Sequence, residues 1–240
     1  MDHEKLIDAL RTEGEALGEV RIADVDVPTC PDWTLPDLLR HVGNVHRWQH
    51  AQVVATDPAQ LVRTDRNEEV SLDALADWYR EGLTALVTAL TQIDPDALTP
   101  SWHGPRPATF WARRAAHETA IHRWDAQAAV SAADPLDPDQ AVDIIDELLE
   151  VLAPFRFRSE DWDGPEVTIH LHATDIEGEW LVGLGSDGLR VERVHAKGDV
   201  AARGPASDLA LMVTGRMPAA RLEVFGDPAV LDRWGGAIRF

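Results

Sequence analysis

The sequence contains a single cysteine, Cys30, and this scarcity excludes several kinds of site. One thiol cannot form a disulfide within the chain, and without a Cys-x-x-Cys pair there is neither a redox dithiol nor a thiolate zinc site. Any metal that the protein binds must therefore be held by histidine and carboxylate side chains.

Basic side chains are also scarce, with 22 Lys and Arg against 42 Asp and Glu and a formal net charge of -20. Such a surface repels nucleic-acid backbones and anionic lipid headgroups, so neither nucleic acid nor a membrane is an expected partner. No apolar run approaches the roughly 18 residues of a membrane span. The first ten residues are acidic where a signal peptide needs basic residues. We expect a cytoplasmic monomer or homodimer.

Apolar residues in the first half of the chain recur with a helical period. This pattern predicts helices over residues 3–18 and 71–93, and further helices are expected over 35–54 and 107–130. Thr34 and Asp37 predict a capping box at the start of the second helix, and the Pro and Gly residues between 95 and 107 separate the third from the fourth. Four long helices indicate an up-down four-helix bundle. A fifth helix is expected over residues 138–152.

The pattern changes to alternation of apolar and polar residues after residue 165, which is typical of strands. Strands are expected over 167–174, 179–185, 189–195, 199–204 and 221–226, with short helices at 206–216 and 227–234. Helices followed by strands indicate the α+β class. We therefore predict a helical bundle over residues 1–157 and a small C-terminal α/β domain with an antiparallel sheet over 158–240, with the boundary between 158 and 164.

Glu118 and His122 are four residues apart on the predicted fourth helix, so both side chains leave the same face about one turn apart. His41, on the predicted second helix, can supply a third ligand from a neighbouring helix of the bundle. Two histidines and one glutamate leave one position of a tetrahedral zinc ion open, as in catalytic rather than structural sites. The sequence therefore predicts that the bundle binds one divalent metal ion, and zinc is the ion that we expect.

Other interpretations of these histidines remain open at this point. A Glu and a His four residues apart often form only a polar helix face or an i,i+4 hydrogen bond. His46 and His50 are also four apart and could chelate a metal without Glu118. His41 and His46 point to different faces of their helix, so both cannot serve one site.

Several nearby residues suggest supporting roles. Asp125, three residues after His122, can orient a ligand, whereas His117 points about 100° away from Glu118 and suits a packing or supporting role. His170 and His172 alternate on one face of a strand, which favours a surface role. Three arginines on the fourth helix can balance its carboxylates: Arg113, Arg114 and Arg123.

Two segments carry a family resemblance: P-T-C-P-D-W-T-L-P-D-L-L-R-H-V, residues 28–42, and H-E-T-A-I-H-R-W-D, residues 117–125. They resemble the mycothiol-dependent maleylpyruvate isomerase family over nearly the whole chain. The resemblance implies a DinB-like zinc-binding bundle joined to a smaller sterol-carrier-like domain. It places the metal ligands at His41, Glu118 and His122, which makes His46 with His50 the weaker pair. It also implies that Arg216, in D-L-A-L-M-V-T-G-R, faces the site, where its planar fork suits a carboxylate substrate.

The resemblance implies mycothiol as a co-substrate and a small electrophilic molecule as the other substrate. The metal would lower the pKa of the thiol, and the thiolate would add to the electrophile. Reversible addition permits cis-trans isomerisation, and irreversible addition makes the protein a thiol S-transferase, which we favour. Two alternatives are a non-catalytic, metal-stabilised protein that binds a small apolar ligand, and a zinc-dependent hydrolase with Asp125 or His117 as its base.

Overall fold

The computed structural model describes residues 1–64, 70–157, 162, 165–186 and 188–237. The chain divides into two compact units, Met1–Asp134 and Pro135–Phe240. The boundary expected from the sequence, between 158 and 164, falls largely on residues outside the described part. The structure divides the chain earlier because the helix that begins at Pro138 packs against residues 206–213 of the second unit.

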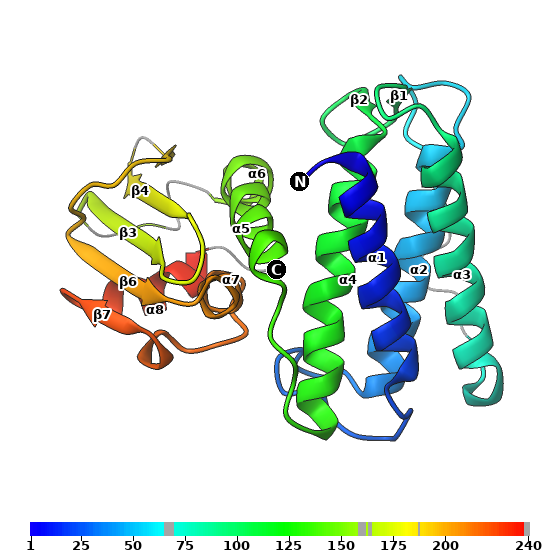
Figure 1. The fold of residues 1–240 in the computed structure, drawn as a ribbon, viewed down its shortest axis with the longest axis horizontal. Coiled ribbons are helices and arrows are strands. Elements are labelled where there is room, and N and C mark those ends of the chain that lie inside the picture. The colour runs from blue at the N-terminus through cyan, green and yellow to red at the C-terminus, as the bar shows by residue number, and fades with distance from the viewer. Residues whose placement is uncertain (65–69, 158–161, 163–164, 187, 238–240) are drawn as a thin grey trace. The chain divides into compact units, whose positions relative to one another are not determined.

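The N-terminal unit is the predicted helical bundle. In the described part of the chain its helices are α1 (His3–Glu19), α2 (Leu35–Val53), α3 (Leu72–Gln92) and α4 (Thr109–Val130). Figure 1 shows them side by side, and α1 and α2 each contact both α3 and α4. A small antiparallel pair, β1 (Leu98–Thr99) and β2 (Arg106–Pro107), lies between α3 and α4. The four predicted helices agree with the observed ones to within two residues at each end.

The start of α2 is fixed by the predicted capping interaction. The backbone N–H and the hydroxyl of Thr34 both donate to Asp37, at 3.0 and 2.6 Å. Hydrogen bonds to the charged form favour it, so the Thr34 hydroxyl and N–H lower the pKa of Asp37. This cap sets the phase of α2, and with it the direction in which His41 leaves the helix two turns later.

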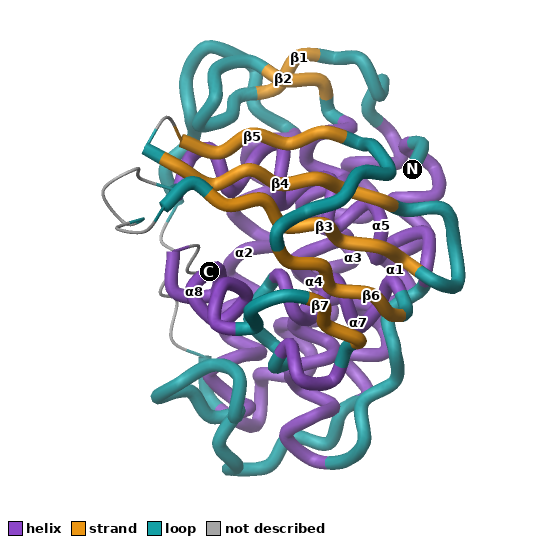
Figure 2. The backbone as a smooth tube through the Cα atoms, turned by 90° about the vertical axis from the view of Figure 1, so that its left-hand side faces the viewer, coloured by secondary structure: helices purple, strands orange, loops and turns teal. Residues whose placement is uncertain are grey.

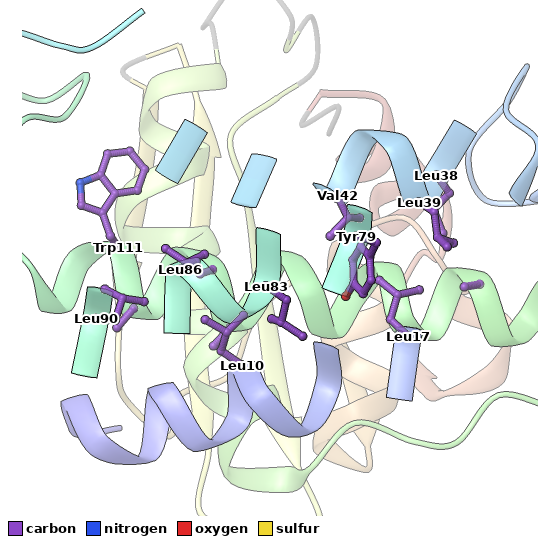
Figure 3. Close-up of a cluster of buried hydrophobic side chains, with 14 of the residues drawn as sticks. Leu10, Leu17, Leu38, Leu39, Val42, Tyr79, Leu83, Leu86, Leu90 and Trp111 are labelled. Atoms are coloured by element: carbon purple, nitrogen blue, oxygen red, sulfur yellow. The ribbon is translucent and has the colours of Figure 1, made fainter. Parts of the chain in front are cut away.

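Buried leucines fill the space between the four helices, together with Tyr79 and Trp111 (Figure 3). The Tyr79 hydroxyl donates to the Gly14 carbonyl of α1 at 3.0 Å, and the Trp111 indole donates to the Pro100 carbonyl at 3.0 Å. Helices α2 and α3 approach closely at Gly43, where a Cβ would lie only 2.1 Å from the Trp78 ring. The Gly43 contact brings α3 against α2 two residues after His41.

One buried ion pair joins α1 to α4. Arg123 donates to Glu13 through Nε at 2.6 Å and through Nη2 at 3.3 Å, and both side chains are less than a tenth exposed. The same guanidinium donates to the Asp134 carbonyl at 2.6 Å, so it also holds the chain that leaves α4. Because both charges are buried, either one would be costly if left without the other.

We expect Glu13→Ala to lower the free energy of unfolding by about 3–5 kcal/mol, because the substitution leaves the Arg123 charge buried without its counter-ion. Urea unfolding of the full-length protein, followed by a signal from the N-terminal unit, measures the change. Asp8→Ala is the matched control, since Asp8 is 71% exposed in its pair with Arg11 and such pairs contribute at most about 1 kcal/mol. Equal effects of the two substitutions would contradict a structural role for the buried pair.

The C-terminal unit combines a sheet with short helices. Helix α5 (Pro138–Glu147) continues through a π-helical turn (Leu148–Leu152) into α6 (Ala153–Arg156), where the sequence predicts one helix to residue 152. The strands described are β3 (Val167–Ala173), β4 (Glu179–Gly185), β5 (Gly188–Glu192), β6 (Val200–Gly204) and β7 (Glu223–Phe225). The remaining elements are α7 (Ala206–Val213), a 3-10 turn (Ala219–Arg221) and α8 (Ala229–Ala237).

The sheet is mixed rather than purely antiparallel. Its order in the described residues is β5-β4-β3-β6-β7, visible in Figure 2, and β3 pairs with β6 in parallel while the other neighbours are antiparallel. The reason is the connection of residues 193–199, which crosses β4 and β3 before β6 begins. Ile169, Leu171 and Val182 face side chains of α7 and α8. Within the described residues no helix has the length and apolar character to cross a bilayer.

Candidate metal centre in the helical bundle

The three predicted metal ligands meet between α2 and α4. Glu118 Oε1 lies 3.3 Å from His41 Nε2 and 3.4 Å from His122 Nε2, and the two imidazole centroids are 5.2 Å apart. One ligand atom from each residue lies within 4.8 Å of the others. The i,i+4 spacing on α4 places Glu118 and His122 on one face, and the packing of α2 against α4 brings His41 to the same point.

Glu118 is oriented by an arginine one turn earlier on α4. Arg114 donates to Oε2 at 2.7 Å, which leaves Oε1 directed at the two imidazoles. Burial alone would raise the pKa of Glu118, but hydrogen bonds from His122 and His41, together with their charge and that of Arg114, lower it well below its ordinary value. Glu118 is therefore an ionised carboxylate, the form that binds metal.

His122 is oriented by a fully buried carboxylate. Its Nδ1 donates to Asp125 Oδ2 at 2.9 Å, so Nε2 is the nitrogen that points toward Glu118. Asp125 also accepts from the Thr29 hydroxyl at 2.6 Å and from the Cys30 thiol at 3.6 Å, both in the loop before α2. A carboxylate behind a histidine in this way fixes the ring and its tautomer in metal sites. Asp125 is therefore buried against His122 rather than facing solvent, in a position from which it can orient this ring.

The side of the centre formed by α2 is the more exposed one. His41 is 34% exposed, Glu118 is 24% exposed and His122 is 8% exposed. Trp33 packs against the His41 ring with centroids 4.7 Å apart and lies 6.3 Å from that of His122. Trp33 therefore covers one side of these ligands, and the His41 ring is partly open to solvent.

The rival pair on α2 does not assemble in the structure. His46 is fully buried and its Nε2 is 2.9 Å from the Thr119 hydroxyl, and burial lowers the pKa of His46 to about 3. Among the described residues, neither His46 nor His50 belongs to a group of potential metal ligands. His117 is buried on α4 and is likewise outside the group, as its 100° offset from Glu118 predicts.

Sequence reasoning missed Thr29, Cys30 and Trp33 as parts of the centre. All three lie in P-T-C-P-D-W-T, the turn-rich segment that carried the family resemblance. The turn is held by backbone bonds such as Trp33 N–H to the Cys30 carbonyl at 3.1 Å. The sequence signal for them was their position, because a compact turn that directly precedes the helix carrying His41 lies close to the metal ligands.

Arg216 belongs to the second unit. It follows Gly215, whose φ of 77° ends α7, and its backbone N–H donates to the Leu211 carbonyl at 2.7 Å. Its guanidinium donates to the Thr214 carbonyl at 2.8 Å. This is the helix end predicted from the sequence. A role of Arg216 in binding substrate stays a prediction.

Comparison with known families identifies the chain. The model of the mycothiol maleylpyruvate isomerase N-terminal domain matches residues 3–127, and that of the corresponding C-terminal domain matches residues 139–233. The chain belongs to this family. The family predicted from residues 28–42 and 117–125 is thereby confirmed, and membership in a family of isomerases supports the expectation of an enzyme.

Solved structures show the same fold at low sequence identity. A crystal structure of the mycothiol-dependent maleylpyruvate isomerase is 14% identical, with 93% of each chain covered and a TM-score of 0.65. A histidine-to-alanine mutant of that enzyme gives 14% identity, the same coverage and a TM-score of 0.59. No curated protein gives a significant match. At this identity the likeness establishes the fold, and the α+β prediction is confirmed.

We expect Asp125→Asn to weaken zinc binding by about 10–100-fold, because an amide holds the His122 ring and its basic nitrogen less well than a carboxylate. Competition with a chromophoric chelator measures the affinity. Asp143→Asn on α5 of the other unit is the control and should leave this affinity unchanged. An unaltered affinity in Asp125→Asn would contradict the orienting role.

The metal-free protein should show a pH dependence that originates at His122. Burial alone would lower its pKa, but hydrogen bonds with Asp125, Cys30 and Glu118 raise it well above 6.5. The charged ring therefore stabilises the fold fully below pH 6.5, and this contribution is lost as the pH rises toward the folded pKa. The lowered pKa of Glu118 acts oppositely, since its contribution is lost only as the pH falls below about 4.5.

In the presence of a chelator, we expect the difference in unfolding free energy between wild type and His122→Gln to be larger at pH 6 than at pH 9. Urea unfolding at the two values measures it. His50→Gln, on the same helix as His41 but outside the centre, controls for loss of a histidine. A difference that does not change with pH would show that His122 does not carry a raised pKa.

Proposed function

We propose that the protein is a zinc-dependent enzyme that activates a low-molecular-weight thiol, mycothiol, for attack on a small electrophilic substrate. The observation that carries the proposal is the convergence of His41, Glu118 and His122 at a point where His41 is partly exposed. The family match supports mycothiol as the thiol, because the family is described as mycothiol maleylpyruvate isomerase.

The donor set fits zinc. Two imidazoles and one carboxylate are the ligands of many catalytic zinc sites, which keep a fourth position for water or substrate. His122 presents its Nε2 because Nδ1 is bonded to Asp125, and Glu118 presents Oε1 because Oε2 is bonded to Arg114. When bound there, zinc would lower the pKa of a thiol so that the thiolate predominates near neutral pH.

The chain's own residues would position the reactants. Trp33 and the exposed edge of His41 border the approach to the ligands, so the thiol would enter from that side. The thiolate sulfur would then add to an electrophilic carbon of a double bond, whose π-electron pair moves onto the conjugated carbonyl. Expulsion of the sulfur after rotation about the resulting single bond would restore the double bond in the isomerised product, whereas protonation of the neighbouring carbon with the sulfur retained would give a thioether. Arg216 is proposed to bind a substrate carboxylate through its two parallel N–H donors.

We favour thiol transfer over maleylpyruvate isomerisation, because we can match no residue of the chain to one particular electrophile. The alternative of a non-catalytic ligand-binding protein draws support from a small apolar pocket in the second unit, between β3, β4, α7 and α8. Hydrolysis is disfavoured, because Asp125 is fully buried behind His122 and accepts from two further donors, where it cannot reach a water molecule as a base.

The first experiment measures the zinc content and the thiol binding of the purified protein. We expect one zinc per chain at this centre, removed by Glu118→Ala and by His122→Ala. In the cobalt-substituted protein, mycothiol should produce a sulfur-to-metal charge-transfer absorption, because the sulfur replaces a bound solvent molecule. His50→Ala is the control and should behave as wild type in both measurements.

Turnover assays then separate the possible activities. Loss of maleylpyruvate measures isomerisation, and disappearance of free thiol with a panel of small electrophiles measures transfer. Zinc that binds without any response to mycothiol would overturn the enzymatic proposal and favour the ligand-binding alternative. Zinc content unaffected by Glu118→Ala and His122→Ala would overturn the centre itself.

A further inference from the structure

A second group of potential metal ligands lies in the C-terminal unit. His170 and His172 come from β3, Glu179 begins β4, and His195 lies in the connection that follows β5. One ligand atom from each of the four lies within 4.8 Å of the others. His170 is only 8% exposed, so the surface role predicted for it is wrong, whereas His172 is partly exposed.

The three imidazoles surround a single carboxylate. Glu179 Oε2 lies 3.0 Å from His170 Nε2 and 2.5 Å from His195 Nδ1, and Oε1 lies 3.5 Å from His172 Nδ1. The imidazole centroids are 5.6 to 6.0 Å apart. Three imidazoles with one carboxylate form a donor set for zinc.

The register of the sheet brings the first three residues together. His172 is the direct partner of Glu179 across the antiparallel β3–β4 pair, and His170 lies two residues before His172 on the same face. Ile169 and Leu171 point to the opposite face, where α7 and α8 pack. The histidines therefore lie on the face of the sheet that these two helices leave uncovered.

The fourth residue, His195, lies on the crossover connection of residues 193–199. Figure 2 shows this connection passing from β5 in front of β4 and β3 to β6. It lies directly on β3, because a Cβ at Gly198 would be 2.8 Å from the backbone nitrogen of His170. The side chain of His195 is 77% exposed, yet its Nδ1 is directed at Glu179.

Both ends of this connection are anchored. At its end, Asp199 accepts from the backbone N–H and the hydroxyl of Thr168 at 2.8 and 2.7 Å. At its start, Arg193 donates to Asp146 at 2.6 Å, and the Trp180 indole donates to the same carboxylate oxygen at 2.7 Å. The short segment between these anchors holds His195 over the strands, so little ordering is needed for the four residues to act together.

We propose that His170, His172, Glu179 and His195 form a structural zinc site that fastens the 193–199 connection to the sheet. Ligand atoms about 2.0–2.1 Å from a tetrahedral zinc lie roughly 3.3 Å from one another. The Glu179 oxygens lie 3.0 Å from His170 Nε2 and 3.5 Å from His172 Nδ1, near that separation, and the 2.5 Å hydrogen bond with His195 Nδ1 would lengthen if zinc replaced it. Four protein ligands would close the coordination shell, which is typical of structural rather than catalytic zinc. The site is independent of the bundle centre, since the two share no residue.

The test measures zinc affinity of the tag-free, full-length protein by competition with a chromophoric chelator. We expect Glu118→Ala protein, which lacks a ligand of the bundle centre, to retain one tight zinc. Adding His195→Ala should lower the zinc affinity at least about tenfold, since loss of a metal ligand lowers affinity no less than loss of a residue that orients a ligand. Adding both His172→Ala and His195→Ala should abolish it.

His50→Ala in the same Glu118→Ala background is the matched control and should leave the affinity unchanged. His195 is on an exposed connection, so its replacement tests the site even where substitution of the buried His170 prevents folding. No tight zinc in the Glu118→Ala protein, or an affinity that His195→Ala and the double substitution leave unchanged, would overturn the proposal. Failure of the bundle centre would instead appear as equal zinc content in wild type and Glu118→Ala.

Discussion

The hydrogen bond from His122 to the buried carboxylate of Asp125 is the constraint on which the bundle centre depends. Asp125 is fully buried, and its other donors, Thr29 and Cys30, come from a turn almost a hundred residues earlier in the chain. One carboxylate therefore ties the loop before α2 to α4, and it also selects the nitrogen that His122 presents. Removing its charge would affect both the docking of α2 and the ligand, so fold and site are not separable at this position.

Local patterns predicted the helical part of the fold well, because each helix has its own signals. The Thr34–Asp37 cap and the apolar period of α2 lie within about 20 residues of sequence. Helix α1 is capped in the same way by Asp2, which accepts from the Lys5 N–H, whereas α4 has no side-chain cap and was located by the Pro and Gly residues before it. The mixed sheet was not predicted, because alternation indicates that a segment is a strand without indicating its neighbour. The parallel β3–β6 pair depends on a connection that crosses two strands, which no local pattern encodes.

The same difference between local patterns and long-range contacts applies to the metal centre of the bundle. Glu118 and His122 could be found from spacing, since the helix itself places them on one face. His41 required the packing of α2 against α4, and the family resemblance supplied what geometry alone left open between His41 and the His46–His50 pair. Thr29 and Cys30 could not be found by spacing at all, because their contact with Asp125 exists only once the turn has docked. Burial explains why His46 was a false candidate, since its ring is enclosed beside Thr119.

The two histidine–glutamate groups differ in the one property that separates catalytic from structural metal sites. In the bundle, Glu118 has one oxygen bonded to Arg114, so three protein atoms are left for an ion and its exposed side remains available to a substrate. In the C-terminal unit, the sheet supplies three groups and the anchored connection supplies a fourth, His195, on the outer side. A fourth protein ligand excludes a substrate from the coordination shell and fixes the loop that carries it. Without a fourth protein ligand, one coordination position stays open for a substrate. The same donor types are therefore expected to form a catalytic site in the bundle and a structural site in the C-terminal unit, because only in the latter does the backbone bring a fourth ligand within reach.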